Sequence, residues 1–115
     1  MGTLLYGSPS TEISFDDRAL THLQIVITAK LRRRESFVFS WNDGLEVGSG
    51  RSSIWLDPSS TLYYHYLGSR APSINREWID VLMRSANSGS GLFFSPEPGL
   101  GDERGTKEPG APRRD

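Results

Sequence analysis

Histidine is the residue type in this chain of 115 residues best suited to acid–base or metal chemistry, and the chain has only His22 and His65. Cysteine is absent, which excludes thiolate zinc sites and cysteine nucleophiles. The two histidines match no zinc-binding spacing, and no G-x-S-x-G segment marks a serine nucleophile. We expect His22 on the exposed flank of a helix and His65 in a strand, packed beside tyrosines. The sequence therefore predicts no catalytic residues, no metal and no cofactor.

A basic segment is the first feature suited to binding. Four cations fall within residues 30–34, and such a cluster can contact the phosphates of a nucleic acid. The alternative is that these cations stabilise the end of a helix, where they meet the negative pole of the helix macrodipole. The candidate phosphate contacts are Lys30, Arg32, Arg33 and Arg34.

Aromatic side chains are the second such feature. Because neighbouring residues of a strand point to opposite faces, the aromatics between residues 41 and 66 cannot all face one side of a sheet. If helices cover one face, the other carries Trp55 and either Tyr63 or Tyr64. We expect this uncovered face, around Trp55, Tyr63 and Arg51, to bind a partner protein or a second copy of the chain. Base stacking, binding of a small ligand and ordinary cross-strand packing remain alternatives.

Charge and hydropathy limit the environment of the protein. The 13 basic and 14 acidic side chains give a net charge of −1, so no overall field attracts nucleic acid or an anionic membrane. No apolar run approaches the ~18 residues of a membrane helix. Residues 1–6 lack the charged start of a secretory signal. With no cysteine, the chain suits a reducing compartment, and we expect it in the cytoplasm without a membrane partner.

Two helices are predicted to position these residues. Asp16 is a suitable N-cap for the first, which we expect to run to about Arg34. Ser73 is the expected cap of the second. Apolar residues recur at helical spacing in both segments. They are Ala19, Leu20, Leu23, Val26, Ile27 and Leu31 in the first, and Ile74, Trp78, Val81, Leu82 and Ala86 in the second.

Strands are predicted at residues 3–7, 12–15, 36–41, 52–56, 61–67 and 91–95. Short connections among the middle three favour an antiparallel meander. The order ββαβββαβ predicts one α+β domain over residues 1–95, an antiparallel sheet with both helices on one face. Residues 96–115 contain four prolines, four glycines and nine charged residues, which predicts a disordered C-terminal tail.

Several motifs of the chain occur together in a recognisable pattern. They are F-D-D-R-A-L at 15–20, H-L at 22–23, A-K-L-R-R at 29–33, S-F at 36–37, F-S-W at 39–41, G-R-S at 50–52, I-W-L at 54–56, I-N-R-E-W-I at 74–79 and S-A-N-S at 85–88. Over about residues 1–98, the chain resembles a small bacterial domain of unknown function whose members often carry the label "ATP-dependent DNA ligase". The resemblance brings no established catalytic residues.

The ligase label can be tested against the residues. ATP-dependent ligases use the lysine amine of a K-x-D-G motif as the nucleophile in covalent catalysis. Here the only x-x-D-G segment is Trp41-Asn42-Asp43-Gly44, and an indole has no nucleophilic amine. The sequence therefore excludes a self-sufficient ligase. It favours a non-catalytic protein-interaction module, with a nucleic-acid-binding accessory protein as the alternative.

Overall fold

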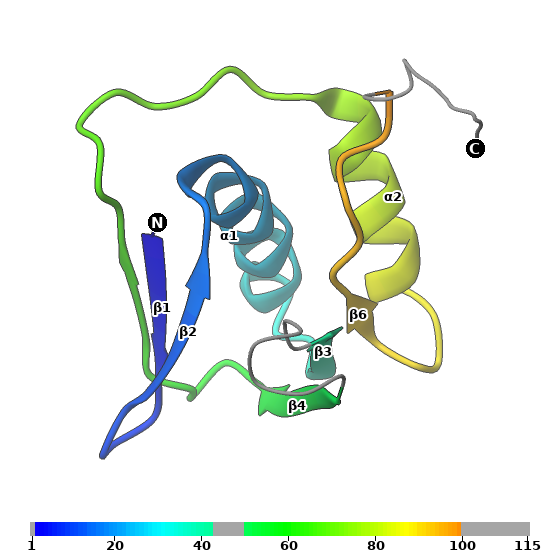
Figure 1. Cartoon of the computed structure of the whole chain (residues 1–115). Coiled ribbons are helices and arrows are strands. Elements are labelled where there is room, and N and C mark those ends of the chain that lie inside the picture. The colour runs from blue at the N-terminus through cyan, green and yellow to red at the C-terminus, as the bar shows by residue number, and fades with distance from the viewer. Residues whose placement is uncertain (1, 43–49, 100–115) are drawn as a thin grey trace.

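The computed structural model describes residues 2–42 and 50–99, and it has the α+β class and the ββαβββαβ order that the sequence predicts (Figure 1). The elements are β1 (Gly2–Tyr6), β2 (Thr11–Phe15), α1 (Asp17–Arg32), β3 (Phe37–Asn42), β4 (Arg51–Leu56), β5 (Leu62–His65), α2 (Arg76–Ala86) and β6 (Leu92–Phe93).

The strands form two sheets, where the sequence suggested one. The first sheet has the order β2-β1-β5 and is antiparallel. The second sheet has the order β4-β3-β6, in which β4 is antiparallel and β6 parallel to β3. The expected meander is thus divided, because β5 leaves β4 and pairs with β1. A turn in which the Asp57 side chain accepts a hydrogen bond from Ser59 N (2.9 Å) redirects the chain, and a short connection does not by itself impose a hairpin.

The two helices do not share one sheet face. In Figure 1, α1 lies between the first sheet and α2, and the second sheet closes the end of the domain to which α1 leads. The inner face of the first sheet packs on α1, whereas α2 packs on α1 and β6. A single core joins these layers because both helices and strands of both sheets contribute fully buried apolar side chains. They include Leu4, Leu20, Leu23, Val26, Ile27, Phe39, Leu56, Leu82 and Leu92.

The helix ends follow capping chemistry. Asp16 caps α1 as expected, accepting a hydrogen bond from Ala19 N at 2.7 Å. The helix ends at Arg32, two residues before the expected end, and Arg34 then adopts the left-handed region with φ of 61°. Asn75 caps α2 in place of Ser73, because its side chain accepts hydrogen bonds from Glu77 N and Trp78 N.

Ile74 was expected on the apolar face of α2. It precedes the cap instead and is 46% exposed. Neither helix among the described residues is long and apolar enough to span a membrane.

Candidate functional site

The outer face of the second sheet exposes two large aromatic side chains, Trp55 and Phe93. Arg51, Ser53 and Trp55 alternate along β4 and point away from the core. The register places Trp55 beside Val38 on β3. It also places Phe93 on β6 beside Ser40 of β3, so its side chain lies on the same face of the sheet. Trp55 is 52% and Phe93 40% exposed. We call this surface the Trp55 face; its members are Val38, Ser40, Arg51, Ser53, Trp55 and Phe93.

The polar atoms of the Trp55 face are largely satisfied within the domain. The indole N–H of Trp55 donates to Asp57 Oδ2 at 3.2 Å, and the hydroxyls of Ser40 and Ser53 lie 2.7 Å apart. Hydrogen bonds from Ser59 and Trp55 lower the pKa of the Asp57 carboxyl, which therefore stays ionised. The indole ring is thus oriented and exposes an apolar surface.

The structure separates Tyr63 from the other two residues of the predicted site. Tyr63 lies on the outer face of the first sheet, is 58% exposed, and has its ring centroid 6.4 Å from that of His65. Tyr64 points inward. The structure thus settles the phase of this strand, which the sequence left open. Trp55 and Arg51 share a face as predicted, whereas Val38 and Phe93 join them through strand pairing that no local pattern reveals.

The basic segment is divided between interior and surface. Lys30 is only 6% exposed; its ammonium donates to Asn87 Oδ1 at 2.7 Å and forms an ion pair with Glu35 Oε1, also at 2.7 Å. The Lys30 ammonium beside it lowers the pKa of the Glu35 carboxyl. Lys30 therefore joins α1 to the end of α2. The exposed members of the segment are Arg32, Arg33 and Arg34.

His22 was expected at an exposed flank, but it is fully buried. Its Nδ1 lies 2.8 Å from Arg18 O, and its Nε2 accepts a hydrogen bond from Asn75 N at 2.8 Å. Because Nε2 accepts, the Nδ1–H tautomer satisfies both contacts. The ring also stacks on Trp78, with centroids 4.6 Å apart. His22 thus serves to join the helices: α2 covers the flank of α1 that periodicity had assigned to solvent.

A second ion pair holds the segment after β6 against α1. Arg18 binds the Glu97 carboxylate through two nitrogens, at 2.8 and 2.7 Å, and Asn75 Nδ2 donates to the same carboxylate. The Arg18 hydrogen bond is the main reason that the pKa of Glu97 falls to about 2. Glu97 belongs to the expected tail, yet it contacts both helices. Residues 96–99 of that expected tail are described, and residues 100–115 lie outside the described residues.

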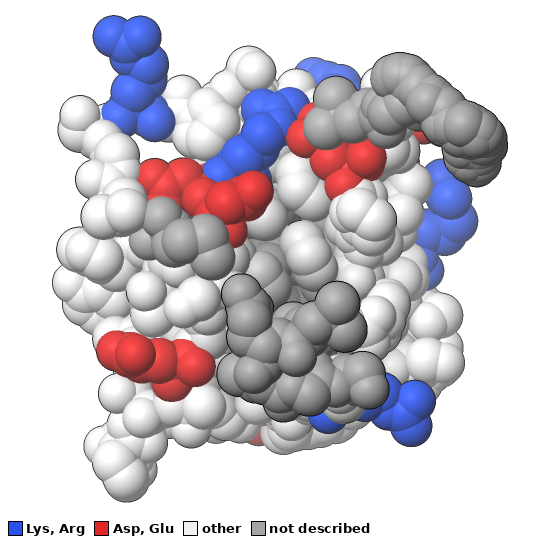
Figure 2. Space-filling model, viewed as in Figure 1, with Lys and Arg blue, Asp and Glu red and all other residues white. Residues whose placement is uncertain are grey.

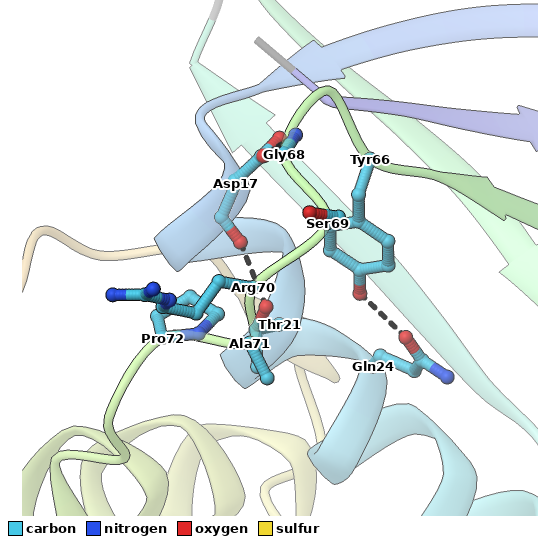
Figure 3. A pocket seen from close by; sticks show the side chains of 9 residues that line it. All are labelled: Asp17, Thr21, Gln24, Tyr66, Gly68, Ser69, Arg70, Ala71 and Pro72. Atoms are coloured by element: carbon cyan, nitrogen blue, oxygen red, sulfur yellow. Dashed lines mark hydrogen bonds between the residues drawn. The ribbon is translucent and has the colours of Figure 1, made fainter.

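A pocket of about 240 Å³ lies between α1 and residues 66–72 (Figure 3). Leu67 N and Gly68 N donate to the Asp17 carboxylate and lower its pKa. The Tyr66 hydroxyl donates to Gln24 Oε1 at 2.5 Å (Figure 3). These polar groups hold the loop on the helix. The pocket is smaller than the roughly 300 Å³ at which ligand sites usually begin.

Charge does not mark a site either. In Figure 2, acidic groups lie in the upper part of the visible face and in a separate cluster at its lower left, and the basic groups are scattered over the upper part and the margins. Among residues 2–42 and 50–99, no group of three His, Asp or Glu side chains is placed to hold a metal ion. We take the Trp55 face as the candidate site because strand pairing holds two exposed aromatic rings, Trp55 and Phe93, on one surface.

The described residues thus form a small α+β domain that exposes Trp55 and Phe93 on the outer face of its second sheet. A family model described as a domain of unknown function, DUF7882, matches residues 1–97, and the chain belongs to this family. No curated protein matches the chain, and no solved structure matches it.

Proposed function

We propose that this domain is a non-catalytic interaction module that binds a partner protein through the Trp55 face. The observation that carries the proposal is the half-exposed Trp55 ring, whose N–H group is bonded to Asp57. An indole held in this way can bury its apolar surface without leaving its donor unpaired. Tryptophan and arginine are also the residues most often found where binding energy concentrates in protein interfaces.

The Trp55 face is rigid because the opposite side of the same strands forms the core. Phe39 and Leu56 are buried directly beneath it, and β3 is hydrogen-bonded on both of its edges. A preorganised face loses little conformational entropy on binding. Arg51 lies at one end of the Trp55 face, where its guanidinium could bind a carboxylate of the partner.

A photo-crosslinking amino acid at Ser53 would test the proposal. Ser53 lies between Arg51 and Trp55, so a bound partner should give a discrete cross-linked species in cells. The same amino acid at Thr28, on the exposed side of α1, is the control and should give none.

The cross-linked polypeptide should then be identified and purified for a binding measurement. We expect Trp55→Ala to weaken this binding by about 30-fold or more, the loss of roughly 2 kcal/mol typical of a central aromatic. Ile25→Ala, which truncates another exposed apolar side chain, should leave the affinity unchanged. Equal cross-linking at positions 53 and 28, or undiminished binding by Trp55→Ala, would contradict the proposal.

A second candidate is an accessory role on nucleic acid, supported by the exposed guanidinium groups of Arg32, Arg33 and Arg34 at the end of α1. Three phosphate contacts predict that the logarithm of the affinity falls with the logarithm of salt concentration at a slope of roughly −3. A titration with duplex DNA at several salt concentrations tests this. A flat response, or a slope unchanged when the three arginines become glutamine, would remove this candidate.

A further inference from the structure

The edge strand β5 has one side without a backbone partner in the described structure. Gly7 N donates to Thr61 O at 3.1 Å, so alternate residues of this strand, Tyr63 and His65, direct their backbone groups toward β1. The backbone groups of Leu62, Tyr64 and Tyr66 therefore point to the other side, where the described residues provide no hydrogen bond. Figure 1 shows this strand, in green, at the outer margin of the first sheet.

This edge lacks the features that usually prevent strands from pairing. Residues 61–67 read T-L-Y-Y-H-Y-L, without an acidic residue, lysine, arginine, proline or glycine. The opposite edge of the same sheet, β2, carries Glu12. On β4, the Tyr6 hydroxyl covers the edge by donating to Trp55 O at 2.5 Å. Among these three edge strands, β5 is thus the least protected.

We propose that β5 pairs antiparallel with β5 of a second copy of this chain, around a two-fold axis at Tyr64. In this register Tyr64 lies opposite Tyr64 of the second copy, and Leu62 lies opposite Tyr66. Each of these pairs exchanges two backbone hydrogen bonds through the groups that are directed outward. The two first sheets then become one continuous six-stranded sheet.

The side chains of the strand complement a second copy of themselves in this register. On the outer face, Tyr63 lies across from His65 of the second copy, and the two-fold axis repeats this pair. Leu67, 71% exposed in the single chain, lies across from Thr61. Because residues 61–67 carry no acidic side chain, lysine or arginine, the axis brings no permanent like charges together. The Trp55 face belongs to the other sheet, so this pairing does not depend on the proposed function.

The absence of cysteine permits a register-specific cross-linking test. In the double variant Tyr63→Cys/His65→Cys, the thiol introduced at position 63 of each chain faces the thiol introduced at position 65 of the second copy. Mild oxidation should therefore give a covalent dimer. Each single variant is a matched control: its new thiol lies diagonally from its equivalent and should cross-link far less. Cross-linking of the double variant no better than that of the singles would overturn the register.

Sedimentation equilibrium of the full chain tests the association itself. We expect the mass to rise from 12.8 kDa toward twice that value with increasing concentration. Tyr63→Lys should raise the dissociation constant about tenfold, because two cross-strand pairs are lost per dimer. Thr28→Lys, which adds the same charge on α1, should leave it unchanged. A wild-type chain that stays monomeric at hundreds of micromolar, with native circular dichroism, would overturn the proposal.

Discussion

The Lys30 ammonium, near the end of α1, donates a hydrogen bond of 2.7 Å to the Asn87 side chain, at the residue that caps the end of α2. This hydrogen bond joins residues that are 57 positions apart in the sequence. The Lys30 ammonium also lies over the Phe37 ring, 5.8 Å from the ring centroid. A residue from the most basic segment of the chain therefore forms part of the packing between the helices.

Replacing Lys30 should destabilise the domain. Lys30→Ala removes a buried cation together with its bonds to Asn87 and Glu35, and we expect the free energy of unfolding to fall by about 2–3 kcal/mol. Arg33→Ala is the matched control. The Arg33 side chain is 60% exposed, and its nitrogen lies 3.9 Å from the Glu35 carboxylate, so its loss should cost less than about 0.5 kcal/mol. Urea denaturation measures both; equal effects would contradict the structural role.

His22 offers a test of hydrogen-bond geometry. The oxygen of a glutamine at this position can accept the hydrogen bond from Asn75 N, whereas leucine, of similar size, cannot. We expect His22→Leu to be about 1–2 kcal/mol less stable than His22→Gln, because a buried backbone N–H group loses its partner. Hydrogen exchange at the Asn75 amide should accelerate most in the leucine variant. Equal stabilities and equal exchange rates would show that this bond contributes little.

From the ionised Glu97 carboxylate we expect part of the free energy of unfolding to be lost in acid. Its pKa, about 2 when folded, lies below its ordinary value near 4.5, so folding favours the ionised form. The resulting stabilisation is present above about pH 5 and is lost as the pH falls toward 2. In Glu97→Gln the drop in unfolding free energy between pH 5 and pH 2 should be smaller, by about 1–2 kcal/mol. An identical acid dependence in both chains would contradict this assignment.

Gly91 controls whether β6 can reach the second sheet. Its φ is 86°, and a Cβ atom at this position would overlap the carbonyl oxygen of Val38. We expect Gly91→Ala to destabilise the domain by at least about 2 kcal/mol, through strain and the clash with the β3 backbone. Because β6 positions Phe93, the variant should also weaken partner binding through the Trp55 face. Gly89→Ala is the control, since no atom beyond its two neighbours in the chain lies within 4 Å of the added methyl group. Equal unfolding free energies of the two variants in urea would contradict this role of Gly91.

Trp55 and Trp78 differ in a way that fluorescence can report. Trp55 is 52% exposed, whereas Trp78 is 3% exposed and donates to Ser95 O at 3.0 Å. Acrylamide should quench a large, red-shifted part of the wild-type emission, and Trp55→Phe should remove that part. Stability should change by less than about 1 kcal/mol, because an exposed ring contributes little to the core. Unchanged quenching in Trp55→Phe would show that the ring is covered.

The sequence by itself determined the local structure. The helical spacing of apolar residues from Ala19 to Leu31 predicted α1, and the residue type at Asp16 predicted its cap. Alternation along a single strand predicted that Arg51 and Trp55 share a face. These features depend on residues within a few positions of one another, where backbone geometry alone sets which side chains lie together.

Only the tertiary structure decided which elements meet. That β5 pairs with β1, that α2 covers His22, and that Glu97 reaches Arg18 across 79 positions all depend on long-range packing. Periodicity assigned His22 to solvent because it describes one helix, and burial depends on the neighbours of that helix. For the same reason, the sequence predicted only part of the Trp55 face. Its β4 residues follow from alternation, and Phe93 joins them only because a buried parallel pairing brings β6 beside β3.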